Sequence, residues 1–154
     1  MVESFELSRA ECETLLRAGV AGRVALAAPG GPHIVPINYS VVDVAIVFRT
    51  SPSSVLGTHG RDAMLVFEID QFDYEYQRGW SVVVQGRSEV VLDPAELAHI
   101  RRVWSPRPWA SGDRPLVVRL PFERVTGRRL GGGWDPLHQL PVRRTLFYDE
   151  RSQR

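Results

Sequence analysis

The stretch VAIVFRTSPSSVL, residues 44–56, decides the predicted fold. It opens with small, β-branched and aromatic residues, which predict a buried strand over residues 44–48. Pro52 stops the strand inside a serine-rich turn, and Val55 and Leu56 then start a short helical turn. The rest of the chain is interpreted around this strand, turn and helix start.

The end of this stretch has two interpretations. A guanidinium, several hydroxyls and the free N–H groups of a helix start would together make an anion-binding site. Alternatively, the stretch is an ordinary hairpin exit, in which Ser and Thr side chains cap the next turn. The stretch alone favours capping, and the flanking sequence supports anion binding. The residues concerned are Arg49, Thr50, Ser53 and Ser54.

Length and composition indicate one globular domain. The 154 residues are 44% hydrophobic and 24% charged, as in ordinary soluble proteins. No apolar run approaches the ~20 residues of a membrane helix, and the acidic N-terminus does not resemble a signal peptide. We therefore expect a cytoplasmic protein without a membrane partner.

Charge and cysteine content exclude several function classes. A net charge of +1 gives no general field for nucleic acid. All 19 basic residues are Arg, which excludes a Schiff-base lysine and a P-loop. The single Cys12 excludes an internal disulfide and a cysteine zinc cluster. The histidines show no metal spacing, and the acidic residues between 68 and 75 fit a solvated loop better, so no metal site is predicted.

Helix and strand signals alternate with Gly/Pro turns. Ser8 and Glu11 form a capping box that predicts a helix ending near Gly19, and Asp93-Pro94 predicts a second helix to about Trp104. Pro36 inside a strand points to an edge, a bulge or a ligand-facing backbone, and Gly86 predicts a bulge. The predicted strands cover residues 22–27, 33–39, 44–48, 63–70, 80–91, 116–120 and 125–130.

This order predicts a mainly β fold, a small β-barrel with helical additions. The barrel domain is expected over residues 1–130. A tail led by three glycines follows over 131–154, and residues 145–148 in it could add to a partner's surface. The run Trp80 to Val84 is expected to bury apolar surface at an interface between subunits.

Seven short motifs follow one another along the chain. They are Gly22-Arg23-Val24-Ala25, Ile34-Val35-Pro36-Ile37-Asn38-Tyr39, Phe48-Arg49-Thr50, Phe67-Glu68-Ile69-Asp70, Gly79-Trp80-Ser81-Val82, Val84-x-Gly86-Arg87 and Arg124-Val125-Thr126-Gly127-Arg128-Arg129-Leu130. In this order and spacing they resemble the pyridoxamine-5′-phosphate-oxidase-like, FMN-binding split-barrel proteins of the small actinobacterial form. The resemblance covers roughly residues 8–130.

The resemblance implies a six-stranded split barrel that forms a homodimer, with a flavin in each of two clefts between the subunits. The strand backbone around Pro36 would pass along the flavin ring, and the arginine and hydroxyls after residue 48 would hold the phosphate. Many relatives carry a Lys where this chain has Val55, which predicts weaker FMN binding. The implied cofactor residues are Val35, Pro36, Ile37, Asn38, Arg49, Thr50, Ser53, Ser54, Val55, Trp80, Ser81 and Trp109.

The implied function is a flavin-dependent oxidoreductase that uses FMN and acts on an unknown small molecule. Because the flavin itself accepts and donates the hydride, few protein acids or bases are needed, and the sequence singles out no catalytic residue. Two alternatives stay open: a reductase of the same fold that uses the deazaflavin F420, and a non-catalytic binder of flavin or haem. Motifs for pyridoxamine phosphate itself are not recognisable, so vitamin B6 oxidation is not assigned.

Overall fold

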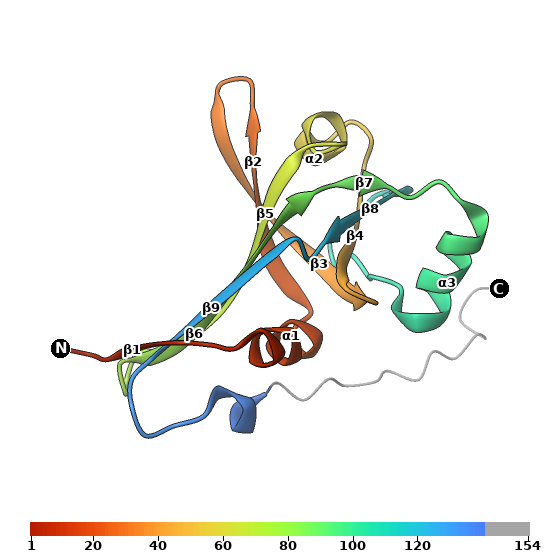
Figure 1. Ribbon diagram of the computed structural model, residues 1–154. Coiled ribbons are helices and arrows are strands. Elements are labelled where there is room, and N and C mark those ends of the chain that lie inside the picture. The colour runs from red at the N-terminus through yellow and green to blue at the C-terminus, as the bar shows by residue number, and fades with distance from the viewer. Residues whose placement is uncertain (141–154) are drawn as a thin grey trace.

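The computed structural model describes residues 1–140, whose strands form one antiparallel sheet curled into a split barrel (Figure 1). The order of strands across the sheet is β1-β9-β6-β5-β2-β3-β4-β8-β7. The strands are β1 (Ser4–Glu6), β2 (Ala21–Ala28), β3 (Gly31–Val42), β4 (Ala45–Thr50), β5 (Met64–Asp73), β6 (Arg78–Arg87), β7 (Glu89–Val90), β8 (Leu116–Pro121) and β9 (Arg124–Leu130). The helices are α1 (Arg9–Ala18), α2 (Val55–His59), α3 (Pro94–Trp104) and the 3-10 turn η1 (Pro136–Gln139).

The long strand β3 joins the two halves of the barrel. Its residues Gly31 to Asn38 pair with β2, whereas Tyr39 to Val42 pair with β4. The halves meet again where β6 contacts β8. The predicted mainly β split barrel is therefore confirmed. Among the described residues the sheet has nine strands where six were expected from the resemblance and seven from the sequence pattern, since β1 was not anticipated and the predicted strand 80–91 is divided into β6 and β7.

Alternation along the strands decides which side chains enter the barrel. Residues one apart point to opposite faces, so Trp80, Val82 and Val84 of β6 all point inward and are at most 6% exposed. These three side chains therefore belong to the core of this chain, and the prediction that they offer interface surface is wrong. Ser81 and Val83 lie on the opposite face of β6 and are partly exposed.

Two of the helices begin as the sequence predicts. Ser8 caps α1 in a complete capping box, and Cys12 and Leu16 on its inner face are buried against the barrel. Burial raises the pKa of the Cys12 thiol, which disfavours the reactive thiolate. Asp93 caps α3, whose Ile100 packs beside β3 and β4.

The glycine at position 86 allows a close approach of two strands instead of a bulge. Gly86 pairs regularly with Leu65 on β5. A Cβ at this position would lie 2.5 Å from the carbonyl oxygen of Pro121, at the end of β8. The predicted bulge is therefore wrong. The predicted strand 80–91 instead breaks at the buried Ser88, whose hydroxyl donates to the carbonyl of Gly60 at 2.6 Å.

The first part of the predicted tail lies against the barrel. Trp134, Leu137 and Leu140 pack on the core, and the indole N–H of Trp134 donates to the carbonyl of Leu130 at 2.9 Å. Residues 145–148, predicted to add to a partner's surface, lie outside the described residues. Within residues 1–140, no helix has the length and apolar character needed to cross a membrane.

Candidate functional site

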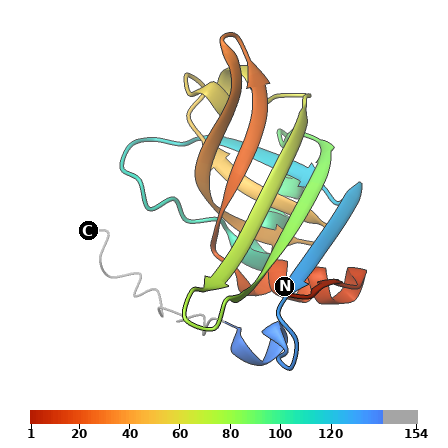
Figure 2. The same cartoon turned by 90° about the vertical axis from the view of Figure 1, so that its left-hand side faces the viewer.

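A cleft of about 160 Å³ lies where the stretch at residues 44–56 leaves the barrel. Its walls come from residues 35–38 of β3, the end of β4, the start of α2 and residues 105–115, which we call the strap. The strap is the extended teal segment that leads from α3 to β8 (Figure 2). The cleft brings together eight of the predicted cofactor residues: Val35, Pro36, Ile37, Asn38, Arg49, Thr50, Ser54 and Val55.

The wall formed by β3 has a free backbone edge. Among the described residues, β4 pairs with β3 only from Tyr39 onward, so residues 31–38 have a neighbour on one side only. The N–H of Tyr39 donates toward β2, to Val20. Since backbone groups alternate sides along a strand, those of Asn38 and Pro36 face away from β2, toward the cleft side. Pro36 is thus an edge proline, as its position in a strand predicts.

Arg49 supplies positive charge at the other wall. Its Nε donates to the carbonyl of Arg114 at 2.9 Å, which fixes the guanidinium beside the strap. Among residues 1–140, the two Nη groups of Arg49 donate to no acceptor, and no Asp or Glu lines the cleft. A half-buried guanidinium with unused donors and no carboxylate partner is suited to binding an anion.

The hydroxyls of the turn are largely committed to one another. Ser54 caps α2 by accepting the N–H of Gly57 at 2.9 Å, and its own proton goes to the carbonyl of Ser51 at 2.8 Å. A hydroxyl carries one proton, so Thr50, 2.7 Å from Ser54, must be the donor in that pair. The capping interpretation thus holds for Ser54, whose cap is supported by the hydroxyl of Thr50, and Arg49 is the group of the stretch with donors left for an anion.

Ser53 does not line the cleft with its neighbours. It is exposed, and its hydroxyl lies 3.0 Å from that of Ser51. Val55, in the first turn of α2, does line the cleft. The position at which a missing Lys predicts weaker FMN binding is therefore part of this cleft.

Asn38 joins the strap to the barrel. Its Oδ1 accepts the backbone N–H of Trp109 at 2.8 Å, and its Nδ2 donates to the carbonyl of Val20 at 3.3 Å. Both ends of the amide are thereby used. Trp109 lies at the cleft rim between the lining residues Pro108 and Ala110 and is 76% exposed.

Trp80 and Ser81, also predicted to contact the cofactor, are not brought to this cleft. Trp80 is 6% exposed and belongs to the core, because its inward position on β6 buries the indole inside the barrel. Ser81, on the opposite face, pairs in register with Asp70 and Arg128. Conversely, sequence reasoning missed Arg114, whose only signal is its place before the strand that pairs with β4.

The outer face of the sheet carries a charged cluster. One Nη of Arg23 lies 2.9 Å from Glu68 and 3.2 Å from Asp70. Partial burial, and then the neighbouring Asp70, raise the pKa of Glu68 above its ordinary value. Two carboxylates therefore share one arginine on this face.

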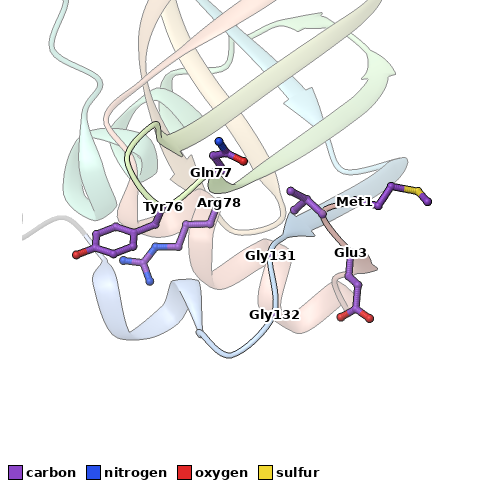
Figure 3. A pocket seen from close by; sticks show the side chains of 8 residues that line it. Met1, Glu3, Tyr76, Gln77, Arg78, Gly131 and Gly132 are labelled. Atoms are coloured by element: carbon purple, nitrogen blue, oxygen red, sulfur yellow. The ribbon is translucent and has the colours of Figure 1, made fainter.

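Two other hollows are less suited to a ligand. A cavity of about 510 Å³ lies between the N-terminal residues and the β5–β6 turn (Figure 3). Its Arg78 is engaged by Asp73 at 3.2 Å and by the rings of Tyr76 and Trp134 at 4.9 and 5.1 Å. The positive charge of Arg78 is therefore already compensated within the chain.

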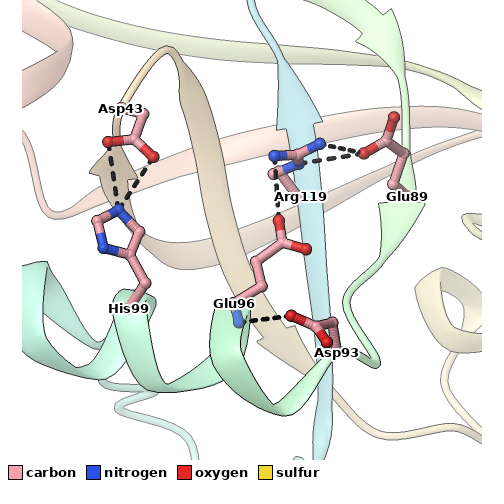
Figure 4. Close-up of polar contacts among 6 residues, drawn as sticks. All are labelled: Asp43, Glu89, Asp93, Glu96, His99 and Arg119. Carbon is pink, nitrogen blue, oxygen red and sulfur yellow. Dashed lines mark hydrogen bonds and ion pairs between the residues drawn. The ribbon is translucent and has the colours of Figure 1, made fainter.

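The second hollow, beside α3, contains polar side chains that already bind one another (Figure 4). His99 lies 3.1 Å from Asp43, and Arg119 binds Glu89 and Glu96 at 2.5 and 3.0 Å. Within residues 1–140, no group of three or more His, Cys, Asp or Glu residues could hold a metal ion.

Comparison with known proteins identifies a family and several relatives. Residues 8–129 match the profile of the family described as pyridoxamine 5′-phosphate oxidase. An uncharacterized protein of Mycobacterium tuberculosis, Rv0080, is 36% identical over 133 residues, which are 83% of this chain and 86% of that protein.

Two solved structures share the fold. An FAD-binding protein from Mycobacterium smegmatis is 32% identical, with a TM-score of 0.68 over 80% of this chain and 96% of the other. A candidate pyridoxamine 5′-phosphate oxidase from Corynebacterium glutamicum is 26% identical, with a TM-score of 0.70 over 86% and 96% of the two chains.

Proposed function

The chain belongs to the pyridoxamine 5′-phosphate oxidase family, and from that membership we propose that it is a flavin-dependent oxidoreductase acting on a small molecule. The flavin binds in the cleft beside α2, which a second copy of the chain completes. The observation that carries the proposal is the pairing of a free β3 edge with an arginine whose Nη groups have no acceptor among residues 1–140.

The cleft residues fit the two ends of a flavin. A ring system needs apolar contact, which Val35 and Ile37 supply. Its carbonyls and nitrogens need backbone groups, and the free edge supplies the carbonyl of Pro36 as an acceptor and the N–H of Asn38 as a donor. A flavin phosphate needs a cation, which Arg49 supplies. The M. smegmatis relative binds FAD. FMN and FAD share a phosphate on the ribityl chain, and this shared group is the one assigned to Arg49.

Two observations support completion by a second copy. The cleft of about 160 Å³ is smaller than the ~300–1,000 Å³ of typical ligand pockets. In addition, the outer face of the sheet exposes apolar side chains: Ile34 is 70%, Met64 58% and Phe72 47% exposed. Register and alternation put all three on the face that also carries Arg23. Such a face is suited to burial against an identical face.

The bound flavin would supply hydride transfer, and the chain's residues bind and orient it. Arg49 holds the phosphate end, and the strap covers the cleft and excludes water from it. The Asn38–Trp109 bond keeps the strap against β3. No residue of this cleft needs to donate or accept a proton for this role, which agrees with finding no acid among the residues of 1–140 that line it.

An absorption spectrum and a cofactor titration test the proposal. We expect flavin absorption in the purified protein, or saturable quenching of flavin fluorescence when riboflavin, FMN or FAD is added. Reduced holoprotein should then pass electrons to a small acceptor such as a quinone faster than free flavin does. A Soret band, or binding of F420 and of no flavin, would overturn the proposal in favour of the haem or deazaflavin alternative.

The subunit arrangement has its own test. Met64→Asp places a charge on the outer face, away from the cleft, and should give a monomer that binds flavin weakly. Val44→Asp is the matched control, because Val44 is 59% exposed in the β3–β4 turn and should leave the dimer intact. Light scattering at micromolar concentration that shows wild-type monomer with full flavin affinity would refute the dimer.

A further inference from the structure

We propose that Arg114 of the strap is a second binding residue for the phosphate end of the flavin, alongside Arg49. The inference rests on the proposed function, because it adds a residue to the same cleft. Arg114 lines that cleft although it lies 65 residues further along the chain than Arg49. Pairing of Thr50 with Leu116 brings the end of the strap beside the end of β4.

The hydrogen bonds of Arg114 leave part of its guanidinium available. Nη1 donates to the carbonyls of Ala110, Ser111 and Gly112 at 3.0, 2.6 and 3.2 Å. These bonds use the two N–H groups of Nη1. Nε and Nη2 donate to no acceptor among residues 1–140, and the side chain is half-buried. A half-buried guanidinium with free donors favours an anionic ligand.

Among residues 1–140, no carboxylate in the wall of the cleft neutralises its charge. Both arginines lie in its wall, whereas Asp113, the acid next to Arg114, is exposed and lies outside the lining. The backbone carbonyl of Arg114 also accepts the Nε–H of Arg49, and this hydrogen bond holds the Arg49 side chain beside Arg114. The cleft therefore presents two guanidinium groups without a carboxylate between them.

Two guanidinium groups match a phosphate in either of two forms. The single phosphate of FMN could accept from both arginines, or the two phosphates of FAD could take one arginine each. The shared chemistry is a phosphate ester on the ribityl chain. Riboflavin has the same ring without the phosphate, so it separates ring binding from phosphate binding.

Titrations of Arg114→Ala with riboflavin, FMN and FAD test the inference. We expect affinity for FMN and FAD to fall about tenfold or more, with riboflavin changed less than about twofold. Arg114→Lys keeps the charge without the fork and should recover part of the loss. Arg107→Ala is the matched control, since Arg107 is an exposed strap residue that does not line the cleft. Inorganic phosphate should compete with FMN and not with riboflavin.

The outcomes separate this inference from the proposed function. A loss with FAD alone supports a diphosphate ligand at Arg114. Equal losses for all three flavins would mean that Arg114 only holds the strap, and unchanged affinities would remove it from the site. Both results overturn the inference while riboflavin binding by the wild type upholds the proposed function. If the wild type binds no flavin at all, the proposed function itself fails.

Discussion

Removing the Ser54 hydroxyl separates helix capping from phosphate binding. In Ser54→Ala the N–H of Gly57 loses its 2.9 Å acceptor, and the hydroxyl of Thr50 loses its 2.7 Å partner. The carbonyl of Ser51 keeps the backbone N–H of Ser54 at 3.1 Å. Two polar groups are therefore left unsatisfied, and one of them, Thr50, is only 5% exposed.

The expected loss follows from these two groups. Loss of an N-cap costs about 1 kcal/mol. A buried hydroxyl without a partner adds roughly 1–3 kcal/mol. The free energy of unfolding should therefore fall by about 2–4 kcal/mol, which lowers the melting temperature by about 5–15 °C for a domain of this size.

Thermal and urea unfolding of the flavin-free protein, followed by circular dichroism, measure this loss. Ser53→Ala is the matched control. Ser53 is exposed, and among residues 1–140 its hydroxyl bonds only that of Ser51, so the change should stay within about 0.5 kcal/mol. Equal effects of the two substitutions would refute the reasoning. So would a Ser54→Ala protein of normal stability that has lost FMN affinity and kept riboflavin affinity, because Ser54 would then be a phosphate ligand.

Three further predictions concern single positions. Val55→Lys should tighten FMN about ten- to a hundredfold and leave riboflavin unchanged, since the new cation reaches only the phosphate; equal effects in both titrations would contradict this. Gly86→Ala should lower the free energy of unfolding by about 1–3 kcal/mol, because its Cβ would meet the Pro121 carbonyl at 2.5 Å. The control Gly132→Ala, whose Cβ would have no atom nearer than 3.5 Å among the described residues, should be nearly neutral in urea unfolding. Partial burial raises the pKa of Glu68, so the folded state keeps this proton at pH values where the unfolded state has lost it. The free energy of unfolding should therefore decline as the pH rises above about 4.5. Glu68→Gln should flatten that decline in pH-dependent unfolding, and an unaltered slope would contradict the assignment.

Local sequence patterns predicted more of the fold than of the candidate site. Ser8 with Glu11, and Asp93 before Pro94, place both helix starts correctly because capping depends on neighbours three residues apart. The same local reasoning read Gly86 as a bulge. Its actual role depends on Pro121, which reaches it only after the sheet curls, so no local pattern could reveal it.

The sequence predicted most of the residues that line the cleft, but not the hydrogen bonds that join its walls. Pro36 and Arg49 line the same cleft because both lie just beyond the end of the β3–β4 pairing. The sequence marks this point with the proline in one strand and with the serine-rich turn after the other. Asn38 lines the cleft as predicted, and its side chain also accepts the backbone N–H of Trp109, which the sequence did not reveal. That bond joins residues 71 positions apart, as the Arg49–Arg114 bond joins residues 65 apart. Contacts of this range depend on the closed barrel and leave no periodic trace in the chain.

The free edge of β3 has a consequence for the behaviour of the protein at high concentration. An unpaired strand edge is a template on which other chains can add a strand and aggregate. Pro36, and Pro32 four residues earlier, each place a nitrogen without hydrogen on that edge. The edge thus keeps its carbonyls, which a small ligand can use, whereas only Ile34 and Asn38 still offer an N–H to a foreign strand. Replacing both prolines with alanine should leave the barrel folded and make the unliganded protein prone to fibrils.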